Sequence, residues 1–127
     1  PSASESEKWN KNSTLYQVLI SIQSQILVEQ PYFNEPGYQN SYKTPSGNKN
    51  SKDYNQNIQL YTLNHAIYDF LNDNKFKEFD DIVKIHFKLK KDRIIKNMEK
   101  WYKDVPNNIK SNYEKVINNI TNLLIDL

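Results

Sequence analysis

Apolar residues recur every three or four positions along most of the chain, which is the spacing of one face of an α-helix. Ser13 or Thr14 can serve as the N-cap of the first such run, because either hydroxyl can accept a free backbone N–H. Pro31 is expected to end this helix, since the residue before a proline is pushed out of the α region. The apolar positions between these limits are Leu15, Val18, Leu19, Ile22 and Ile26.

A polar segment, residues 31–50, follows the first helix and holds both glycines of the chain. Pro36-Gly37 and Pro45-Ser46-Gly47 are turn signals. The overlapping stretch EQPYFNEPGYQNS combines three aromatic residues with two prolines and a glycine. Connections longer than about 12–15 residues without regular structure are usually functional or disordered. Two interpretations stay open for this stretch, a packed structural corner and a loop that meets a partner.

Four further helices and no strand are expected after this segment. One covers residues 51–72, and the next covers residues 73–88 with Asp73 or Asn74 as its cap. The stretch KLKKDR then interrupts the pattern before a short helix, and in the last helix Pro106 fits the first turn. The buried side of the helix over residues 73–88 is expected to comprise Phe76, Phe79, Ile82, Val83, His86 and Phe87. The apolar stripe of the last helix comprises Ile109, Tyr113, Val116, Ile117, Ile120, Leu123, Leu124 and Leu127. The predicted fold class is therefore mostly α, with about five helices.

Composition excludes several classes of function. A chain of 127 residues makes one domain or part of one, and a formal net charge of +2 with interleaved lysines and acids gives no surface for nucleic acid. No apolar run is long enough to span a bilayer, and the N-terminal stretch PSASESEK lacks a signal-peptide pattern. The absence of cysteine excludes disulfides, cysteine-ligated zinc and a cysteine nucleophile within the chain, and it is compatible with a cytoplasmic or nuclear location.

No group of residues predicts a metal or cofactor site. His65 and His86 have no acidic or histidine partner at metal-ligand spacing, so packing or surface roles are favoured over metal binding or general-base catalysis. Asp80 and Asp81 are adjacent and do not face each other on a helix. They are expected in a solvated first turn, where the helix dipole favours acids. Two glycines ten residues apart cannot form a phosphate-binding loop.

Ile20 is the apolar residue of the first helix that does not fit its main stripe. At about 100° per residue it points away from the stripe and shares its side with Gln17, Ser21 and Ser24. Either both faces of the helix are covered, or Ile20 is an exposed anchor for a partner.

The stretch WNKNSTLYQVLISIQSQILVEQPYFNEPGY resembles the region just after the active-site cysteine of ubiquitin-conjugating enzymes, the E2s. The matching parts are Trp9, the VLISI core at residues 18–22 and the loop at residues 31–36. The motifs SIQS, QPYFNEPGY, TPSG and FKEFDDIVKIHFKLKKDRI are similar to those of the large Apollon/BRUCE-type E2s. The resemblance covers residues 9–102 and is weak or absent in the last helix.

The resemblance implies that the chain is the C-terminal helical part of an α+β ubiquitin-conjugating (UBC-like) fold. Residues 1–105 would form the C-terminal half of the UBC core, and residues 106–127 an additional helix. The sheet that precedes this half in the family would then cover the apolar faces. The nucleophilic cysteine of the family lies just upstream of the position of Trp9, so it is outside this chain, and the isolated chain is not expected to be active.

The resemblance also implies roles for individual residues. Glu35, before Pro36, matches the acidic residue that helps to activate the incoming lysine, and Asn34 matches its active-site neighbour. For Glu35 the alternative is an ordinary surface charge. Gln17, Ile20 and Ser24 match the helix face that contacts the donor ubiquitin. The chain departs from the family near Lys11, where the usual proline is missing, and in its longer, more aromatic loop.

The partners implied for the parent protein are ubiquitin, an E1 activating enzyme, an E3 ligase and a substrate lysine, without nucleic acid, membrane, metal or cofactor. A cytoplasmic or nuclear location is expected. The alternative function is a non-catalytic E2-like variant or a helical protein-interaction module that uses its last helix to bind a partner.

Overall fold

The computed structural model describes residues 8–127, so the N-terminal stretch without a signal-peptide pattern lies almost wholly outside the described residues. Of the described residues, 78% are helical and none is in a strand, which confirms the mostly α fold class with about five helices. The chain divides into two compact units, Pro1–Ser51 and Lys52–Leu127, which are described separately. None of the helices in the described part combines the length and apolarity needed to cross a membrane.

The first unit contains the predicted first helix. Thr14 is its N-cap: the Thr14 hydroxyl accepts the Gln17 N–H at 3.2 Å, and the Gln17 side chain accepts the Thr14 N–H at 2.8 Å. The helix is α1 (Leu15–Ser21), and it continues as a π-helical turn, η2 (Ile22–Ile26). The prediction that Pro31 ends the helix is wrong, because the helix already stops at Ile26 and Pro31 opens the next helical turn.

The polar segment is more ordered than its composition suggests. It forms two 3-10 turns, η3 (Pro31–Asn34) and η4 (Tyr38–Ser41), before α2 (Pro45–Tyr61) begins. Gly37 has φ 94°, which L side chains rarely adopt, so the turn predicted at Pro36-Gly37 is confirmed. The second predicted turn is wrong: Pro45 starts α2, where the fixed φ of proline suits the first helical turn.

Helical structure after the polar segment runs further than predicted. After α2 the chain continues through the π-helix η5 (Thr62–Tyr68) into α3 (Asp69–Asp73), so the helix expected at residues 51–72 begins at residue 45. The two helices predicted around KLKKDR are one helix, α4 (Asp80–Tyr102). Lysine, leucine and arginine all favour helix, and the core-facing side continues across this stretch from Phe87 to Met98.

The start of α4 differs from the prediction that Asp73 or Asn74 caps it. A 3-10 turn, η6 (Lys77–Phe79), comes between, and Phe79 precedes α4 without a side-chain cap. Asn74 instead holds the segment between α3 and α4 by hydrogen bonds. Its amide donates to the Phe76 carbonyl at 2.9 Å, and its side-chain oxygen accepts the Phe76 N–H at 3.0 Å. Asn74 is buried, and all three of its polar contacts hold the chain that leads into α4.

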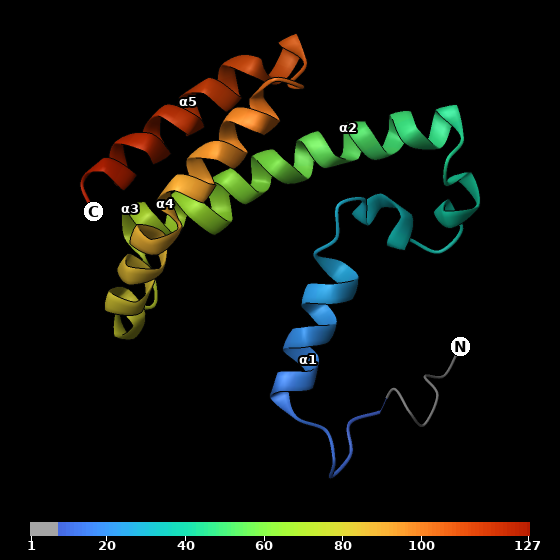
Figure 1. The fold of residues 1–127 in the computed structure, drawn as a ribbon, viewed down its shortest axis with the longest axis horizontal. Coiled ribbons are helices and arrows are strands. Elements are labelled where there is room, and N and C mark those ends of the chain that lie inside the picture. Colours follow the sequence, from blue (N-terminus) through green and yellow to red (C-terminus); the bar gives the residue numbers. More distant parts are fainter. Residues whose placement is uncertain (1–7) are drawn as a thin grey trace. The chain divides into compact units, whose positions relative to one another are not determined.

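One hydrophobic core holds the second unit together. Figure 1 shows α4 lying beside α5 (Asn107–Ile125), with the chain reversing direction between the two helices. Pro106 is the N-cap of α5. Both η5 and α3 also pack against α5. The Gln56 amide donates to the Asp104 carbonyl at 2.6 Å and ties α2 to the turn before α5. The buried apolar residues are Leu63, Phe87, Met98, Val105, Tyr113, Ile120 and Leu124.

The core includes the predicted stripe of the last helix except Leu123, but only part of the predicted stripe before it. Tyr113, Ile120 and Leu124 are buried, and other members of the α5 stripe pack around them. Of the six residues assigned to the buried side of residues 73–88, only Val83 and Phe87 contribute to the core. The other four, Phe76, Phe79, Ile82 and His86, are exposed. Phe76 and Phe79 lie outside α4, so the helical stripe predicted through them does not form there. Ile82 and His86 are exposed because the core-facing side of α4 is set by Val83 and Phe87.

Candidate functional site

The first helix presents apolar side chains to solvent on both of its faces. No residue of α1 or η2 is buried, and Leu15 is 68% exposed. Ile20 is 42% exposed, and Ile22 on the other face is 41% exposed. A helix that is apolar on opposite sides is normally covered on both of them. The helix therefore exposes apolar side chains both on its main apolar stripe and at Ile20.

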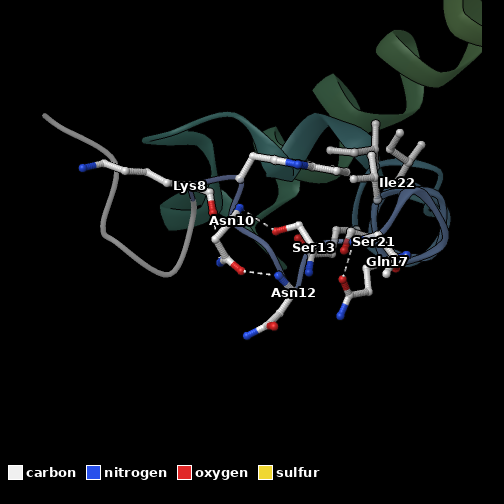
Figure 2. A pocket seen from close by; sticks show the side chains of 12 residues that line it. Lys8, Asn10, Asn12, Ser13, Gln17, Ser21 and Ile22 are labelled. Atoms are coloured by element: carbon white, nitrogen blue, oxygen red, sulfur yellow. Dashed lines mark hydrogen bonds between the residues drawn. The ribbon is translucent and has the colours of Figure 1, made fainter.

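Part of the main apolar stripe, Val18, Ile22 and Ile26, lines a groove of about 580 Å³ together with polar residues of the helix that include Gln17 and Ser21. Figure 2 shows the N-terminal turn around Asn10 and Asn12 on one side of this groove, and Gln17, Ser21 and Ile22 on the other. The turn is held by its own hydrogen bonds, from the Asn10 N–H to Ser13 Oγ at 3.0 Å and from the Asn12 N–H to Asn10 Oδ1 at 2.8 Å. Of the predicted partner-binding residues, only Gln17 lines the groove.

The three predicted partner-binding residues differ in how freely their side chains can meet a partner. The Gln17 side chain is engaged in the cap of α1. Ser24 Oγ donates to the Ile20 carbonyl at 2.9 Å, within its own helix. Ile20 itself presents an exposed aliphatic side chain. Ile20 is therefore the one of the three whose side chain makes no hydrogen bond within the helix and offers apolar surface.

Aromatic rings pack against one another along the loop that follows the helix. Tyr32 and Tyr38 are stacked with ring centroids 4.6 Å apart, and Tyr32 meets the edge of Phe33 at 5.2 Å. Phe33 also contacts Tyr42 edge-on at 5.1 Å. Such pairs add about 0.5–1.5 kcal/mol each beyond the area that they bury. The rings of this stretch therefore pack as the interpretation as a packed corner expects, and its contact with a partner stays a prediction.

Asn34 and Glu35 lie at the end of the first 3-10 turn of this loop. The Asn34 side-chain amide donates to the backbone carbonyl of Gln25 at 2.7 Å, so it points back toward the end of the preceding helix. Glu35 is exposed, has extended backbone and accepts the Tyr38 N–H on its carbonyl at 3.1 Å. The two neighbours thus differ: Asn34 is bound within the fold, and the carboxylate of Glu35 faces solvent.

His65 has an acidic partner, contrary to the prediction that it is isolated. Its Nδ1 lies 3.0 Å from Asp69 Oδ2, and its ring stacks on Tyr61 with centroids 6.1 Å apart. The spacing of four residues could have revealed this pair, because residues i and i+4 are neighbours on a helix. Among residues 8–127 no group of three or more potential ligands is placed to hold a metal ion.

The other residues considered for catalysis or metal binding, His86, Asp80 and Asp81, have structural roles. His86 is exposed and meets the edge of Phe87. Asp80 and Asp81 lie in the first turn of α4, as predicted. A hydrogen bond from Asn74, with Lys84 close by, holds the pKa of the Asp80 carboxyl below its ordinary value of 3.8. These two acids therefore stabilise a helix start and do not form a carboxylate pair.

Comparison with known proteins shows where the chain has relatives. No model of a protein family matches it. A probable ubiquitin-conjugating enzyme E2 of Acanthamoeba polyphaga mimivirus is 39% identical over 115 residues, which are 91% of this chain and 8% of that protein. The dual E2 ubiquitin-conjugating enzyme/E3 ubiquitin-protein ligase BIRC6 of Homo sapiens is 43% identical over 100 residues, 78% of this chain and 2% of that protein.

A probable ubiquitin-conjugating enzyme of Caenorhabditis elegans is 41% identical over 101 residues, which are 80% of this chain and 14% of that protein. The chain thus spans a small part of each of these relatives, while most of the chain is matched. The homologues of the chain are therefore ubiquitin-conjugating enzymes (E2s), with the Apollon/BRUCE-type protein BIRC6 among them, which is consistent with a C-terminal UBC-like segment.

Proposed function

We propose that the chain is the part of an E2 enzyme that follows the catalytic cysteine, and that the whole protein transfers ubiquitin from a cysteine thioester to a substrate lysine. The observation that carries this proposal is the identity of 39–43% to ubiquitin-conjugating enzymes over 78–91% of the chain. In this proposal residues 1–105 complete the conjugating core, and residues 106–127 add a helix. The protein works in the cytoplasm or nucleus with an E1, an E3 and ubiquitin.

Glu35 is proposed to assist the attack of the lysine. The amine nitrogen forms a bond to the thioester carbonyl carbon, the C–S bond breaks and the cysteine leaves as a thiolate. The ammonium group must lose a proton before or during this attack, and a carboxylate beside it can accept the proton. Glu35 supports this role because it is exposed at the end of a hydrogen-bonded turn.

The outer side of α1 is proposed to contact the donor ubiquitin through Ile20, with Gln17 and Ser24 beside it. Ile20 supports this role because its aliphatic side chain is exposed on the side of the helix away from the main apolar stripe. The main stripe, of which Val18, Ile22 and Ile26 line the groove, remains available to the part of the parent fold that precedes this chain in sequence. Both faces of the helix are then occupied in the working protein.

A single-turnover assay on the cysteine-containing parent protein tests the role of Glu35. Glu35→Gln should leave thioester loading by E1 unchanged and slow discharge to free lysine by about 10²-fold, the usual scale for a lost acid–base group. Glu78→Gln, the same change in η6, is the matched control and should leave both steps unchanged. Equal discharge rates for Glu35→Gln and the native protein would remove Glu35 from the mechanism.

The alternative is a non-catalytic E2-like variant or a helical interaction module. The exposed apolar residues of α1 are compatible with such a module. The upstream cysteine distinguishes the two functions, because an E2 enzyme requires a cysteine upstream of Trp9 and an interaction module does not. A parent protein without that cysteine, or one that E1 does not load, favours the module.

A further inference from the structure

The loop between the first helix and α2 is fastened to both of them. At its start, Asn34 Nδ2 donates to the Gln25 carbonyl at 2.7 Å. At its end, Asn50 Nδ2 in the early part of α2 donates to the Tyr32 hydroxyl at 3.3 Å. These bonds join residues nine and eighteen positions apart, so they fix the shape of the loop rather than a local turn.

Asn34 binds the Gln25 carbonyl, which lies at the end of η2. Gln25 is the second-last residue of η2, where the chain leaves the helix. The last carbonyls of any helix lack donors from a following turn and need other partners. The Asn34 amide supplies one from the next 3-10 turn, and it thereby joins the end of η2 to the end of η3 (Pro31–Asn34).

The second half of the loop is held by a closely spaced set of bonds. The Thr44 hydroxyl donates to the Ser41 carbonyl at 2.7 Å and accepts the Gly47 N–H at 3.0 Å. The Ser41 hydroxyl donates to the Tyr38 carbonyl at 2.8 Å, and Tyr38 stacks on Tyr32. The loop is therefore a structured unit from one helix to the next, and Glu35 lies inside it.

Glu35 depends on these neighbours for its position. Within the described residues its carboxylate makes no hydrogen bond or ion pair of its own, and its backbone carbonyl is held by the Tyr38 N–H. The direction of its side chain is set by the backbone at residues 34 and 35. Asn34 is the residue on the N-terminal side that anchors this backbone to the helix.

We infer that Asn34 is a positioning residue for lysine transfer: its amide bond to the Gln25 carbonyl fixes the backbone that carries Glu35. This inference rests on the proposed role of Glu35. In this inference Asn34 does not contact the substrate. Its side chain is needed only as a hydrogen-bond donor to the Gln25 carbonyl, and not as a polar group at the active site. An error of about 1 Å in the placement of a catalytic group can cost about 10²-fold in rate.

The test uses the full-length, cysteine-containing protein with three loop variants. Asn34→Asp keeps the shape of the side chain but replaces the donor by an acceptor, which would face the Gln25 carbonyl oxygen. Asn34→Ala removes the donor without adding charge. Asn40→Asp adds the same charge at an exposed position of η4 in the same loop, and is the matched control. Hydrogen–deuterium exchange over residues 22–38 is measured together with E1 loading and single-turnover discharge over a range of lysine concentrations.

Both Asn34 variants should exchange faster over residues 27–38, load normally, and show a maximum discharge rate lowered about tenfold with an unchanged half-saturating lysine concentration. Asn40→Asp should match the native protein. In the double variant with Glu35→Gln, discharge should be no slower than with Glu35→Gln alone, since Asn34 acts through Glu35. Normal loading shows that the variants are folded.

Three results would overturn the inference. Unchanged exchange in both Asn34 variants would mean that the bond to Gln25 does not hold the loop. Faster exchange with native discharge rates would mean that the loop is held without consequence for the reaction. Additive effects of Asn34→Ala and Glu35→Gln would assign Asn34 an independent role. If Glu35→Gln alone discharges at the native rate, the proposed role of Glu35 has failed, and the exchange data still report on the loop.

Discussion

Gly47, in the first turn of α2, lies directly against the backbone of Ser41. A Cβ added at Gly47 would be 2.0 Å from the Ser41 carbonyl oxygen and 2.8 Å from its carbon. No side chain fits there without movement of the main chain. Glycine at this position is therefore what lets η4 pack against the start of α2.

Gly47→Ala should accordingly loosen the loop. We expect a loss of about 1–3 kcal/mol for forcing a methyl group into this contact. Faster hydrogen–deuterium exchange over residues 38–48 would report the change. Gly37→Asn is the control: the space around Gly37 is open, and asparagine tolerates its left-handed φ of 94°, so the loss should stay below about 1 kcal/mol. A larger effect at Gly37 than at Gly47 would contradict the packing described for Gly47.

Asn74→Ala should destabilise the second unit and change its response to acid. Loss of the buried amide leaves the Phe76 backbone without its partners, which costs about 1–3 kcal/mol in urea unfolding at pH 7. The pKa of Asp80 lies below 3.8 when folded, so Asp80 stabilises the fold above that pH and this contribution is lost as the pH falls through the folded pKa.

In Asn74→Ala the pKa of Asp80 should move back toward 3.8, because the hydrogen bond from Asn74 is the largest cause of its lowering. The dependence of unfolding free energy on pH below about 4 should then become shallower. An NMR titration of the Asp80 carboxyl in both proteins measures this directly. Identical titration midpoints would show that Asn74 does not act on Asp80.

Leu124 and Ile125 give a matched test of the core. Leu124 is fully buried and Ile125 is 63% exposed, although they are neighbours on α5. Leu124→Ala should lower the free energy of unfolding by about 2–5 kcal/mol. Ile125→Ala should change it by less than about 1 kcal/mol. Similar losses for both variants in urea denaturation would mean that α5 faces the core differently.

Ile20 and Ile22 provide a similar pair for the proposed ubiquitin contact, since their exposures are nearly equal but they lie on different faces of the helix. Ile20→Ala in the parent protein should slow discharge to lysine about tenfold, the effect of losing one central contact residue. It should slow E1 loading much less. Ile22→Ala, on the groove side, should not reproduce this selective effect on discharge. Equal slowing of loading and discharge by Ile20→Ala would argue against a donor-ubiquitin surface.

Features of the fold set by local spacing could be predicted from the sequence. Thr14 and Gln17 are three residues apart, so the N-cap of the first helix follows from the chain itself. The stripe that includes Tyr113, Ile120 and Leu124 has helical period, and its core position follows from that period. The continuity of α4 was missed because a run of charged residues resembles a break, while the core-facing side passes through it.

The details of the candidate site depend on contacts that sequence spacing does not specify. Asn34 meets Gln25 nine residues away, and Gly47 meets Ser41 through the packing of two turns. The resemblance assigned Asn34 to the active-site flank, but it gave no sign that the Asn34 amide is bonded to the preceding helix. The pair of His65 and Asp69 could have been predicted from the sequence, because residues four positions apart are neighbours on a helix.

The central claim is that this chain completes an E2 enzyme whose cysteine lies upstream of Trp9. The most direct measurement is single-turnover loading of the full-length parent protein with E1, ATP and ubiquitin, followed by separation with and without reducing agent. The account predicts a ubiquitin adduct that reducing agent removes, that disappears when the upstream cysteine is replaced by alanine, and that transfers ubiquitin to added lysine. Loading that persists without any cysteine, or no loading of a folded parent protein, would contradict it.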